Sequence, residues 1–263
     1  MKQREIFLPL LKRYCEDNMD AIQSSNYPWC PFIPVAFNDY DTCSPKIFYI
    51  GIDTYYWGVT NLELIKAYRT DTLDTILNKN NEVVTPERIL CEWKENKGQF
   101  WSFVCKLHLY NRTGKLFSNY DLRNLNQKEC SYISEIGWGN MNSIELKRTL
   151  EKEDYWRSIN KGDYWKLKAS SGILIDPIKN IIDAYSPDYI YILGWGDSTD
   201  HIFRGLQFTE LNEHYKENYR ALYQIKDCAT KVVWTSHPRR FGFLYTNQEK
   251  MIPYLVNSLN LFQ

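Results

Sequence analysis

Residues 46–58, with the sequence KIFYIGIDTYYWG, carry the strongest indication of how this chain folds. An apolar run at residues 47–50 ends at Gly51, where an extended strand can turn sharply, and Asp53 follows among aromatic residues. In open α/β sheets, ligands collect beyond the carboxyl ends of the strands. A strand that ends in Gly-x-Asp can therefore place a carboxylate where chemistry takes place. A buried parallel strand followed by an ordinary turn is the simpler alternative.

Length and charge indicate one domain without a global electrostatic field. The 263 residues can bury a sizeable core, and we expect a single α/β domain over residues 1–263, with an N-terminal helix and loop at residues 1–45 and a candidate insertion at residues 111–129. Lysine plus arginine equals aspartate plus glutamate, 32 each, so a contact with nucleic acid must come from a local patch. No apolar run could span a bilayer, which predicts a soluble, cytoplasmic protein with no membrane partner, and we expect a monomer.

The cysteines predict no metal site. Seven cysteines are scattered along the chain without a C-x-x-C pair, a pattern typical of reduced cytosolic thiols rather than of zinc or iron–sulfur ligands. Cys15, Cys30 and Cys43 could still meet in the fold. Nine tryptophans and twenty tyrosines supply core packing, and a protein that stacks on bases would need such rings as well. We therefore expect neither a metal nor another cofactor.

Apolar periodicity predicts alternating helices and strands. We expect an irregular loop at residues 27–34, which contain three prolines, and strands at residues 47–50, 189–193 and 231–235, with a weaker strand signal within residues 131–142. Helical spacing is found at residues 1–20, 62–79, from Pro86, 99–109, 143–160, 173–185, 211–226 and 244–261, the last interrupted near Pro253. The predicted buried face of the second helix comprises Leu62, Ile65, Leu73, Ile76 and Leu77. His108 is expected to be a surface or partly packed histidine.

The helix, break and strand of residues 173–193 form half of a βαβ crossover, which implies a parallel sheet. The predicted fold is thus an α/β three-layer sandwich with a mainly parallel central sheet flanked by helices. The strand ends would place four functional candidates along one edge of this sheet, Asp53, either Asn140 or Asn142, Trp195 and His237.

Two motifs at these strand ends resemble those of the uracil-DNA glycosylase superfamily. Residues 51–56, Gly-Ile-Asp-Thr-Tyr-Tyr, are similar to that family's Gly-Gln-Asp-Pro-Tyr-His, and residues 56–58 resemble the Pro-Phe-Gly segment of its single-strand-selective branch. Residues 237–241, His-Pro-Arg-Arg-Phe, resemble His-Pro-Ser-Pro-Leu. The resemblance spans residues 46–241 and implies the family's fold and its base-excision chemistry on DNA.

Several residues within these motifs differ from those of the family. Thr54 replaces the family's proline, Tyr56 replaces its histidine, and Arg239 and Arg240 replace small residues of the second motif. Strict specificity for uracil is therefore not implied. The four-cysteine pattern of the iron–sulfur branches is absent from the sequence, so the resemblance implies no cluster.

The resemblance implies roles for one carboxylate and one histidine. Breaking an N-glycosidic bond develops positive charge on the sugar and negative charge on the departing base. Asp53 would stabilise the oxocarbenium-like sugar and orient a water, unless it is a turn or helix-capping aspartate. His237 would donate a hydrogen bond to the base oxygen, unless it merely ends the strand before Pro238.

The remaining candidates would bind the substrate. Asn140 would contact the base edge with its amide, with Asn142 as a rival for the role and a turn asparagine as the alternative for both. Gly51 and the aromatic residues after Asp53 would form the base pocket. Phe241 would fill the hole left by the flipped base, and the two arginines before it would hold flanking phosphates. These groups are Gly51, Tyr55, Tyr56 and Trp57, and then Arg239, Arg240 and Phe241.

Three functions from different classes remain open. The first is a DNA glycosylase that acts on uracil or another altered base flipped out of DNA. The second is a catalytically silent member of the same fold that binds a nucleic acid or nucleotide. The third is an unrelated α/β hydrolase acting on a small nucleoside or phosphorylated compound, for which the sequence contains no Gly-x-Ser-x-Gly, P-loop or Gly-x-Gly-x-x-Gly motif.

Overall fold

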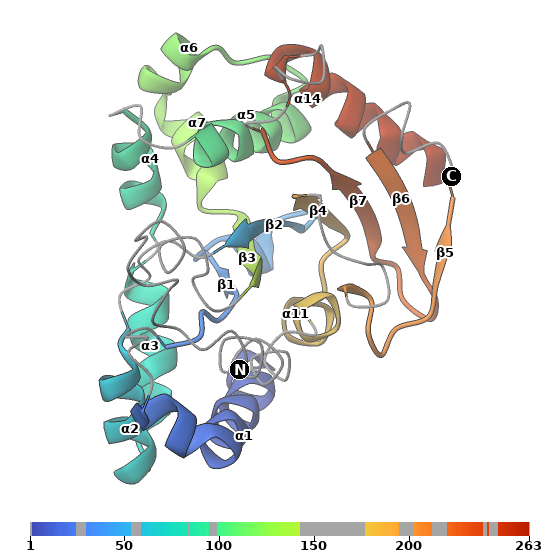
Figure 1. The fold of residues 1–263 in the computed structure, drawn as a ribbon. Helices are drawn as coiled ribbons and strands as arrows, with labels where there is room; N and C mark the ends of the chain where they lie inside the picture. Colours follow the sequence, from blue (N-terminus) through green and yellow to red (C-terminus); the bar gives the residue numbers. More distant parts are fainter. Residues whose placement is uncertain are drawn as a thin grey trace, which may run out of the picture.

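The chain forms one mixed sheet with helices on both of its faces (Figure 1). The structure, a computed structural model, describes residues 2–24, 30–53, 59–83, 85–94, 99–142, 177–194, 202–211, 220–238, 241 and 247–262. Within these residues the sheet has seven strands in the order β1-β3-β2-β4-β7-β6-β5. The predicted α/β class is confirmed, and the arrangement agrees with three layers.

Four parallel strands form the centre of the sheet. β2 (Ile47–Asp53) lies between β3 (Ile136–Asn142) and β4 (Tyr189–Leu193), and β7 (Lys231–Thr235) lies on the other side of β4. All three pairings between them are parallel. Their near-continuous apolar runs are typical of strands that are covered on both faces, and the three predicted strands are confirmed.

Antiparallel strands complete both edges. β1 (Val35–Ala36) pairs with β3, while β6 (Arg220–Ile225) pairs with β7 and β5 (Phe208–Glu210) pairs with β6. The predicted helix at residues 211–226 is therefore wrong, because residues 220–225 are a strand. Buried residues of β6 alternate between the two apolar layers: Ala221, Tyr223 and Ile225 pack on one face and Leu222 on the other.

Two apolar layers fill the space between sheet and helices. On one face, Phe48 and Ile50 of β2 belong to a cluster with α1 (Lys2–Ser24), α2 (Asn61–Arg69), α3 (Asp74–Val83) and α11 (Pro177–Tyr185). On the other, Ile47 and Tyr49 belong to a cluster with α4 (Pro86–Lys94), α5 (Gln99–Thr113), α7 (Gln127–Ile133) and α14 (Gln248–Asn257). This alternation follows the two-residue period of a strand.

The predicted helix at residues 62–79 is divided in two. α2 ends before a turn in which Asp71 has a φ of 55°, and α3 begins at Asp74. Ile65, Ile76 and Leu77 are buried as predicted, but Leu62 is 76% exposed. The turn changes the phase of the helical face, so one periodicity drawn across both helices put Leu62 on the wrong side.

Residues 111–133 contain three helical segments joined by short turns, where an irregular excursion was predicted. α5 continues to Thr113, and α6 (Asn119–Arg123) and α7 each begin with a capping box, Ser118 with Asp121 and Asn126 with Glu129. In each capping box the side chains bind backbone N–H groups of the first helical turn. Polar residues that suggested a loop therefore mark the beginnings of helices. Leu122 and Ile133 are buried in the same layer as α5, so this segment is part of the fold.

The C-terminal helix begins at the capping residue Asn247. α14 contains Pro253 without ending there, and a 3-10 helix (Ser258–Phe262) follows it. Another 3-10 helix (Tyr40–Thr42) precedes β2. The helix predicted at residues 143–160 lies outside the described residues. Among the helices that the structure describes, none has the length and apolar character needed to cross a membrane.

Candidate functional site

The carboxyl ends of the four parallel strands lie along one edge of the sheet. From β2 the chain passes first to β3 on one side and then to β4 on the other, so the direction of the connections reverses between β2 and β4. Ligands of open α/β sheets bind at such a switch point. The register pairs Gly51 with Asn140 and Asp53 with Asn142.

Asn140 and Phe100 pack closely over Gly51. An added Cβ on Gly51 would lie 2.6 Å from Asn140 Oδ1 and 3.2 Å from the nearest atom of the Phe100 ring. Any larger residue at this strand end would displace the amide or the ring. Gly51 is thus required here for close approach rather than for an unusual backbone angle.

Phe100 also contacts His237. The two rings are stacked with centroids 6.1 Å apart and an angle of 23° between their planes. His237 is half-buried and comes two residues after the end of β7. Phe100, at the beginning of α5, therefore brings together the strand ends of β2, β3 and β7. The helical spacing of residues 100–107 predicted that Phe100 is buried, but no motif indicated that it would lie at the site.

Asn140 has a polar atom without a partner. The residue is only 4% exposed, and its Nδ2 makes no hydrogen bond. An unpaired buried amide donor costs roughly 1–3 kcal/mol, so such groups call for an explanation. A ligand with a carbonyl or ring-nitrogen acceptor would satisfy this donor.

Other predicted site residues are placed only in part or not at all. Asp53 and Asn142 are the paired last residues of β2 and β3, and their side chains lie outside the described part of the structure. The same holds for all atoms of Tyr55, Tyr56, Trp57, Trp195, Arg239 and Arg240.

Phe241 does not form a surface wedge in this structure. It is 1% exposed and packs against Phe103 of α5, with ring centroids 5.1 Å apart in an edge-on arrangement. Its apolar character fits the core as well as it fits a wedge, and sequence alone does not separate these two roles.

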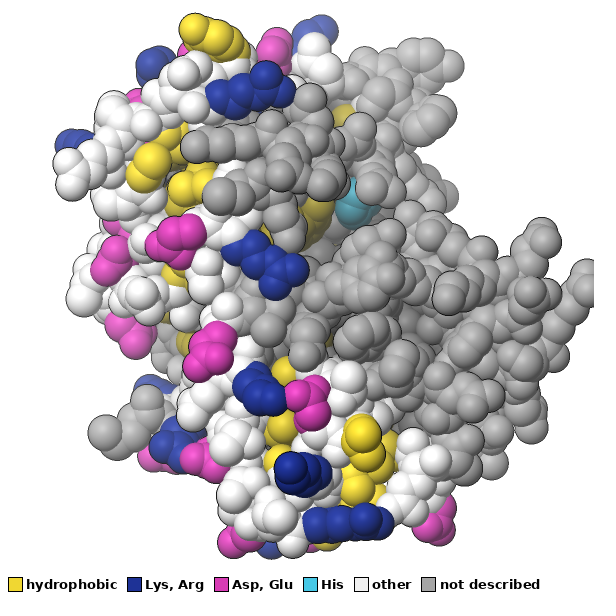
Figure 2. Space-filling view, turned by 90° about the vertical axis from the view of Figure 1, so that its left-hand side faces the viewer, with side chains coloured by type: hydrophobic (Ala, Val, Ile, Leu, Met, Phe, Trp, Pro, Cys, Tyr) yellow, Lys and Arg dark blue, Asp and Glu magenta, His cyan; other side chains and the backbone are white. Residues whose placement is uncertain are grey.

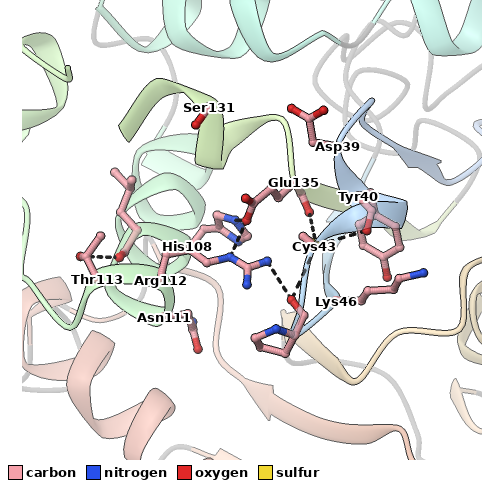
Figure 3. Close-up of polar contacts among 12 residues, drawn as sticks. Asp39, Tyr40, Cys43, Lys46, His108, Asn111, Arg112, Thr113, Ser131 and Glu135 are labelled. Carbon is pink, nitrogen blue, oxygen red and sulfur yellow. Dashed lines mark hydrogen bonds and ion pairs between the residues drawn. The ribbon is translucent and has the colours of Figure 1, made fainter. Parts of the chain in front are cut away.

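A second polar cluster lies at the opposite, amino end of the strands (Figure 3). Arg112 Nε lies 2.6 Å from Glu135 Oε2, and Arg112 Nη2 donates a hydrogen bond to the Pro45 carbonyl at 2.8 Å. His108 Nε2 faces the same Glu135 oxygen at 3.8 Å, and its Nδ1 is 3.1 Å from the Tyr49 hydroxyl. This cluster joins α5, the turn before β3 and the loop before β2.

Burial determines the protonation of this second cluster. His108 is fully buried rather than a surface histidine, and desolvation lowers its pKa although Glu135 acts in the opposite direction. Desolvation also raises the pKa of the Tyr49 hydroxyl. Because Tyr49 and His108 are both inaccessible to solvent, the Tyr–His–Glu arrangement cannot reach a substrate. We interpret it as a structural network.

The described residues do not suggest a metal centre. No group of three or more His, Cys, Asp or Glu among them is arranged to hold an ion. Cys15, Cys30 and Cys43 are free thiols, and burial raises the pKa of each of them. Basic and acidic side chains are interspersed over the described part of the face in Figure 2, without a broad patch of one sign.

Comparison with models of known protein families finds no match to this sequence. No curated protein matches it either. The functional argument therefore depends on the residues at the carboxyl edge of the sheet.

Proposed function

We propose that this protein is a DNA glycosylase-like hydrolase that breaks the N-glycosidic bond of uracil or another altered base after the base has left the stack. The observation that supports the proposal most directly is the buried Asn140 amide, which has an unpaired donor and lies beside the Phe100 ring that stacks on His237. The order of Gly51, Asn140 and His237 along the chain, at or beyond the carboxyl ends of β2, β3 and β7, agrees with it.

The Asn140 amide would bind the edge of the flipped base. Its nitrogen can donate to a base carbonyl, and the oxygen of the same amide can accept from a ring N–H. A base bound in this way satisfies the buried donor that is unpaired in the free protein. Binding and base selection would thus use the same side chain.

Asp53 would act on the sugar side of the bond. Positions 49, 51 and 53 of an extended strand belong to the same face, and Tyr49 lies in the layer that contains α5. A carboxylate at position 53 would stabilise the positive charge that develops on the sugar and would orient the attacking water. The water oxygen bonds to C1′ as the bond to the base breaks, and the proton that the water gives up passes through the carboxylate to solvent and neutralises the base anion.

His237 would act on the base side of the bond. The departing base leaves as an anion, and the imidazole would donate a hydrogen bond to the base oxygen on which this charge gathers. Its stacking on Phe100 would fix the direction of that donor. Loss of one such donor typically costs on the order of 100-fold to 1000-fold in rate.

Base excision tests this assignment directly. Labelled single- and double-stranded oligonucleotides carrying uracil or other altered bases would be incubated with the native protein and with Asp53→Asn, His237→Ala and Asn140→Ala. We expect release of one base by the native protein and a loss of about 100-fold or more in the Asp53 and His237 variants. Asp71→Asn, which changes an exposed aspartate in a turn, is the matched control and should keep full activity.

Each negative outcome of this experiment leads to a different conclusion. Binding of oligonucleotides without excision would favour a silent binding protein of the same fold. Neither excision nor binding would favour an unrelated α/β hydrolase. Excision that persists in both Asp53→Asn and His237→Ala would contradict the roles given to these residues.

A further inference from the structure

Arg220 lies at the same edge of the sheet as the candidate site. It is the first residue of β6, and its Cα partner in β7 is Thr235. Ser236 and His237 follow Thr235 directly. Because β6 runs antiparallel to β7, the beginning of β6 and the carboxyl end of β7 coincide. Arg220 is thus a neighbour of the strand end that carries His237.

The Arg220 guanidinium is buried against Tyr254 of α14. Arg220 is 9% exposed, its Cζ lies 4.1 Å from the centre of the Tyr254 ring, and its Nη1 donates to the Tyr254 carbonyl at 3.2 Å. Neither Arg220 Nε nor the Tyr254 hydroxyl has a well-aligned hydrogen bond, although both atoms are buried. The two side chains interact chiefly with each other, and no carboxylate of the described residues takes part in this contact.

No carboxylate of the described residues lies within ion-pair distance of Arg220. Two other cations in the same helical layer differ in this respect. Arg112 is paired with Glu135. Burial lowers the pKa of Lys106, but Glu249 and Asp121 are close enough to act in the opposite direction. A buried charge without a counter-charge destabilises a fold, so a cation in this state is a candidate for binding an anion.

The end of α14 compensates for part of the Arg220 charge. The Tyr254 carbonyl belongs to the last turn of this helix, where the helix dipole places roughly half of a negative charge. The contact explains how the guanidinium is held, but it leaves the net positive charge without a carboxylate. Arginine binds the oxygens of a phosphate with two or more N–H groups, so a phosphate is a suitable counter-charge.

We propose that Arg220, held against the Tyr254 ring, is a phosphate subsite that binds a backbone phosphate of the nucleic-acid strand next to the flipped nucleotide. This inference deepens the proposed function and rests on it for the identity of the ligand. A flipped nucleotide carries its own 5′ and 3′ phosphates into the site, and Arg220 begins the strand adjacent to that of His237. The contact would position the strand without reading its sequence.

The salt dependence of binding tests the subsite without requiring base recognition. The probe is a single-stranded oligonucleotide with one abasic analogue, titrated at several salt concentrations against the native protein and Arg220→Gln. One lost phosphate contact reduces the slope of log K against log salt by about 0.7 for a single strand. We expect that reduction and a weaker binding of several-fold to tenfold. Arg13→Gln, an exposed arginine on α1, is the control and should keep the native slope.

Two further measurements separate folding from binding. Arg220→Lys keeps the positive charge and should retain much of the slope but less of the affinity than native, because lysine binds phosphate as a point charge. The thermal unfolding of each variant shows whether it is folded. A native slope in folded Arg220→Gln would overturn the subsite, whatever the outcome of base excision.

Inorganic phosphate decides the case in which the native protein binds no oligonucleotide. Phosphate that raises the Tm of the native protein but not that of Arg220→Gln would support an anion subsite and overturn its assignment to a nucleic-acid strand. Phosphate without effect on the native Tm would overturn the subsite altogether. If the Asp53→Asn variant loses base excision but keeps the native salt slope, the change affects the base site and leaves the phosphate subsite intact.

Discussion

The two ends of the parallel strands bury polar groups in different states. At the amino end, Arg112 is paired with the Glu135 carboxylate and donates to the Pro45 carbonyl, although Arg112 Nε, Glu135 Oε2 and His108 Nε2 form no well-aligned hydrogen bond. At the carboxyl end, Asn140 Nδ2 has no hydrogen-bond partner, and Arg220 forms no ion pair with a carboxylate of the described residues. The first set holds α5 and two loops together. The second set gains its partners only if a ligand supplies them.

This difference separates structural polar groups from candidate binding groups. A buried arginine with a carboxylate beside it holds the joined elements in one arrangement, whereas a buried charge or amide donor without a partner costs stability in the free protein. Local departures of this kind are expected at functional sites. Residue type alone does not distinguish the two ends, because each contains a buried arginine. The presence or absence of a carboxylate beside the arginine does.

Removal of the amino-end carboxylate should produce the largest effect on stability. Glu135→Ala would leave the Arg112 side chain, which is 7% exposed, without its counter-charge. Breaking a buried pair by removing one partner costs about 3–5 kcal/mol, and since Glu135 is 18% exposed we expect about 3 kcal/mol. Urea denaturation of native and variant protein measures this change in the free energy of unfolding.

A surface ion pair provides the control for this prediction. Arg4 and Asp74 are 3.0 Å apart, with side chains 58% and 40% exposed. Exposed pairs of this kind contribute roughly 0–1 kcal/mol, so Arg4→Ala should have little effect. A loss below about 1 kcal/mol in Glu135→Ala would show that the amino-end network is not a stability element, and the contrast between the two ends would fail.

A methyl group at the carboxyl end should have an intermediate effect. Gly51→Ala would place its Cβ within 3.3 Å of the Phe100 ring and only 2.6 Å from Asn140 Oδ1. Overpacking of this kind costs about 1–3 kcal/mol. In the double variant Gly51→Ala with Asn140→Ala the closest clash is absent, so we expect the second change to recover part of the loss. A denaturant double-mutant cycle measures this coupling.

The outcome of this cycle reports on the packing of the site. Purely additive changes would mean that Asn140 does not lie over Gly51. Asn140→Ala alone should alter the free energy of unfolding little, because removal of the unpaired donor offsets the packing lost with the buried side chain. Such a variant would be stable and yet impaired in base binding, as expected of a group retained for a ligand.

Continuous apolar strands could be predicted from the sequence, and so could the strand-end positions of Gly51, Asn140 and His237. The helix predicted over β6 is wrong because short apolar runs carry no reliable period, and the pairing with β7 determines the structure of this segment. The positions of Phe100 and Arg220 at the site could not be predicted for a related reason. Their roles depend on contacts between α5, β6, β7 and α14, and tertiary contacts leave no local pattern in the sequence.

The smallest effect should be a pH dependence that originates at the amino end. Burial lowers the pKa of His108 below its usual value of about 6.5. Between the folded and unfolded pKa values the unfolded chain binds more protons, so the free energy of unfolding falls as pH decreases below about 6.5 and levels off below the folded pKa. The slope from one histidine is at most about 1.4 kcal/mol per pH unit. Denaturation across this range should show a flatter profile in His108→Gln than in the native protein. An unchanged slope in a folded His108→Gln variant would show that the pH dependence does not originate at His108, and this part of the contrast would fail.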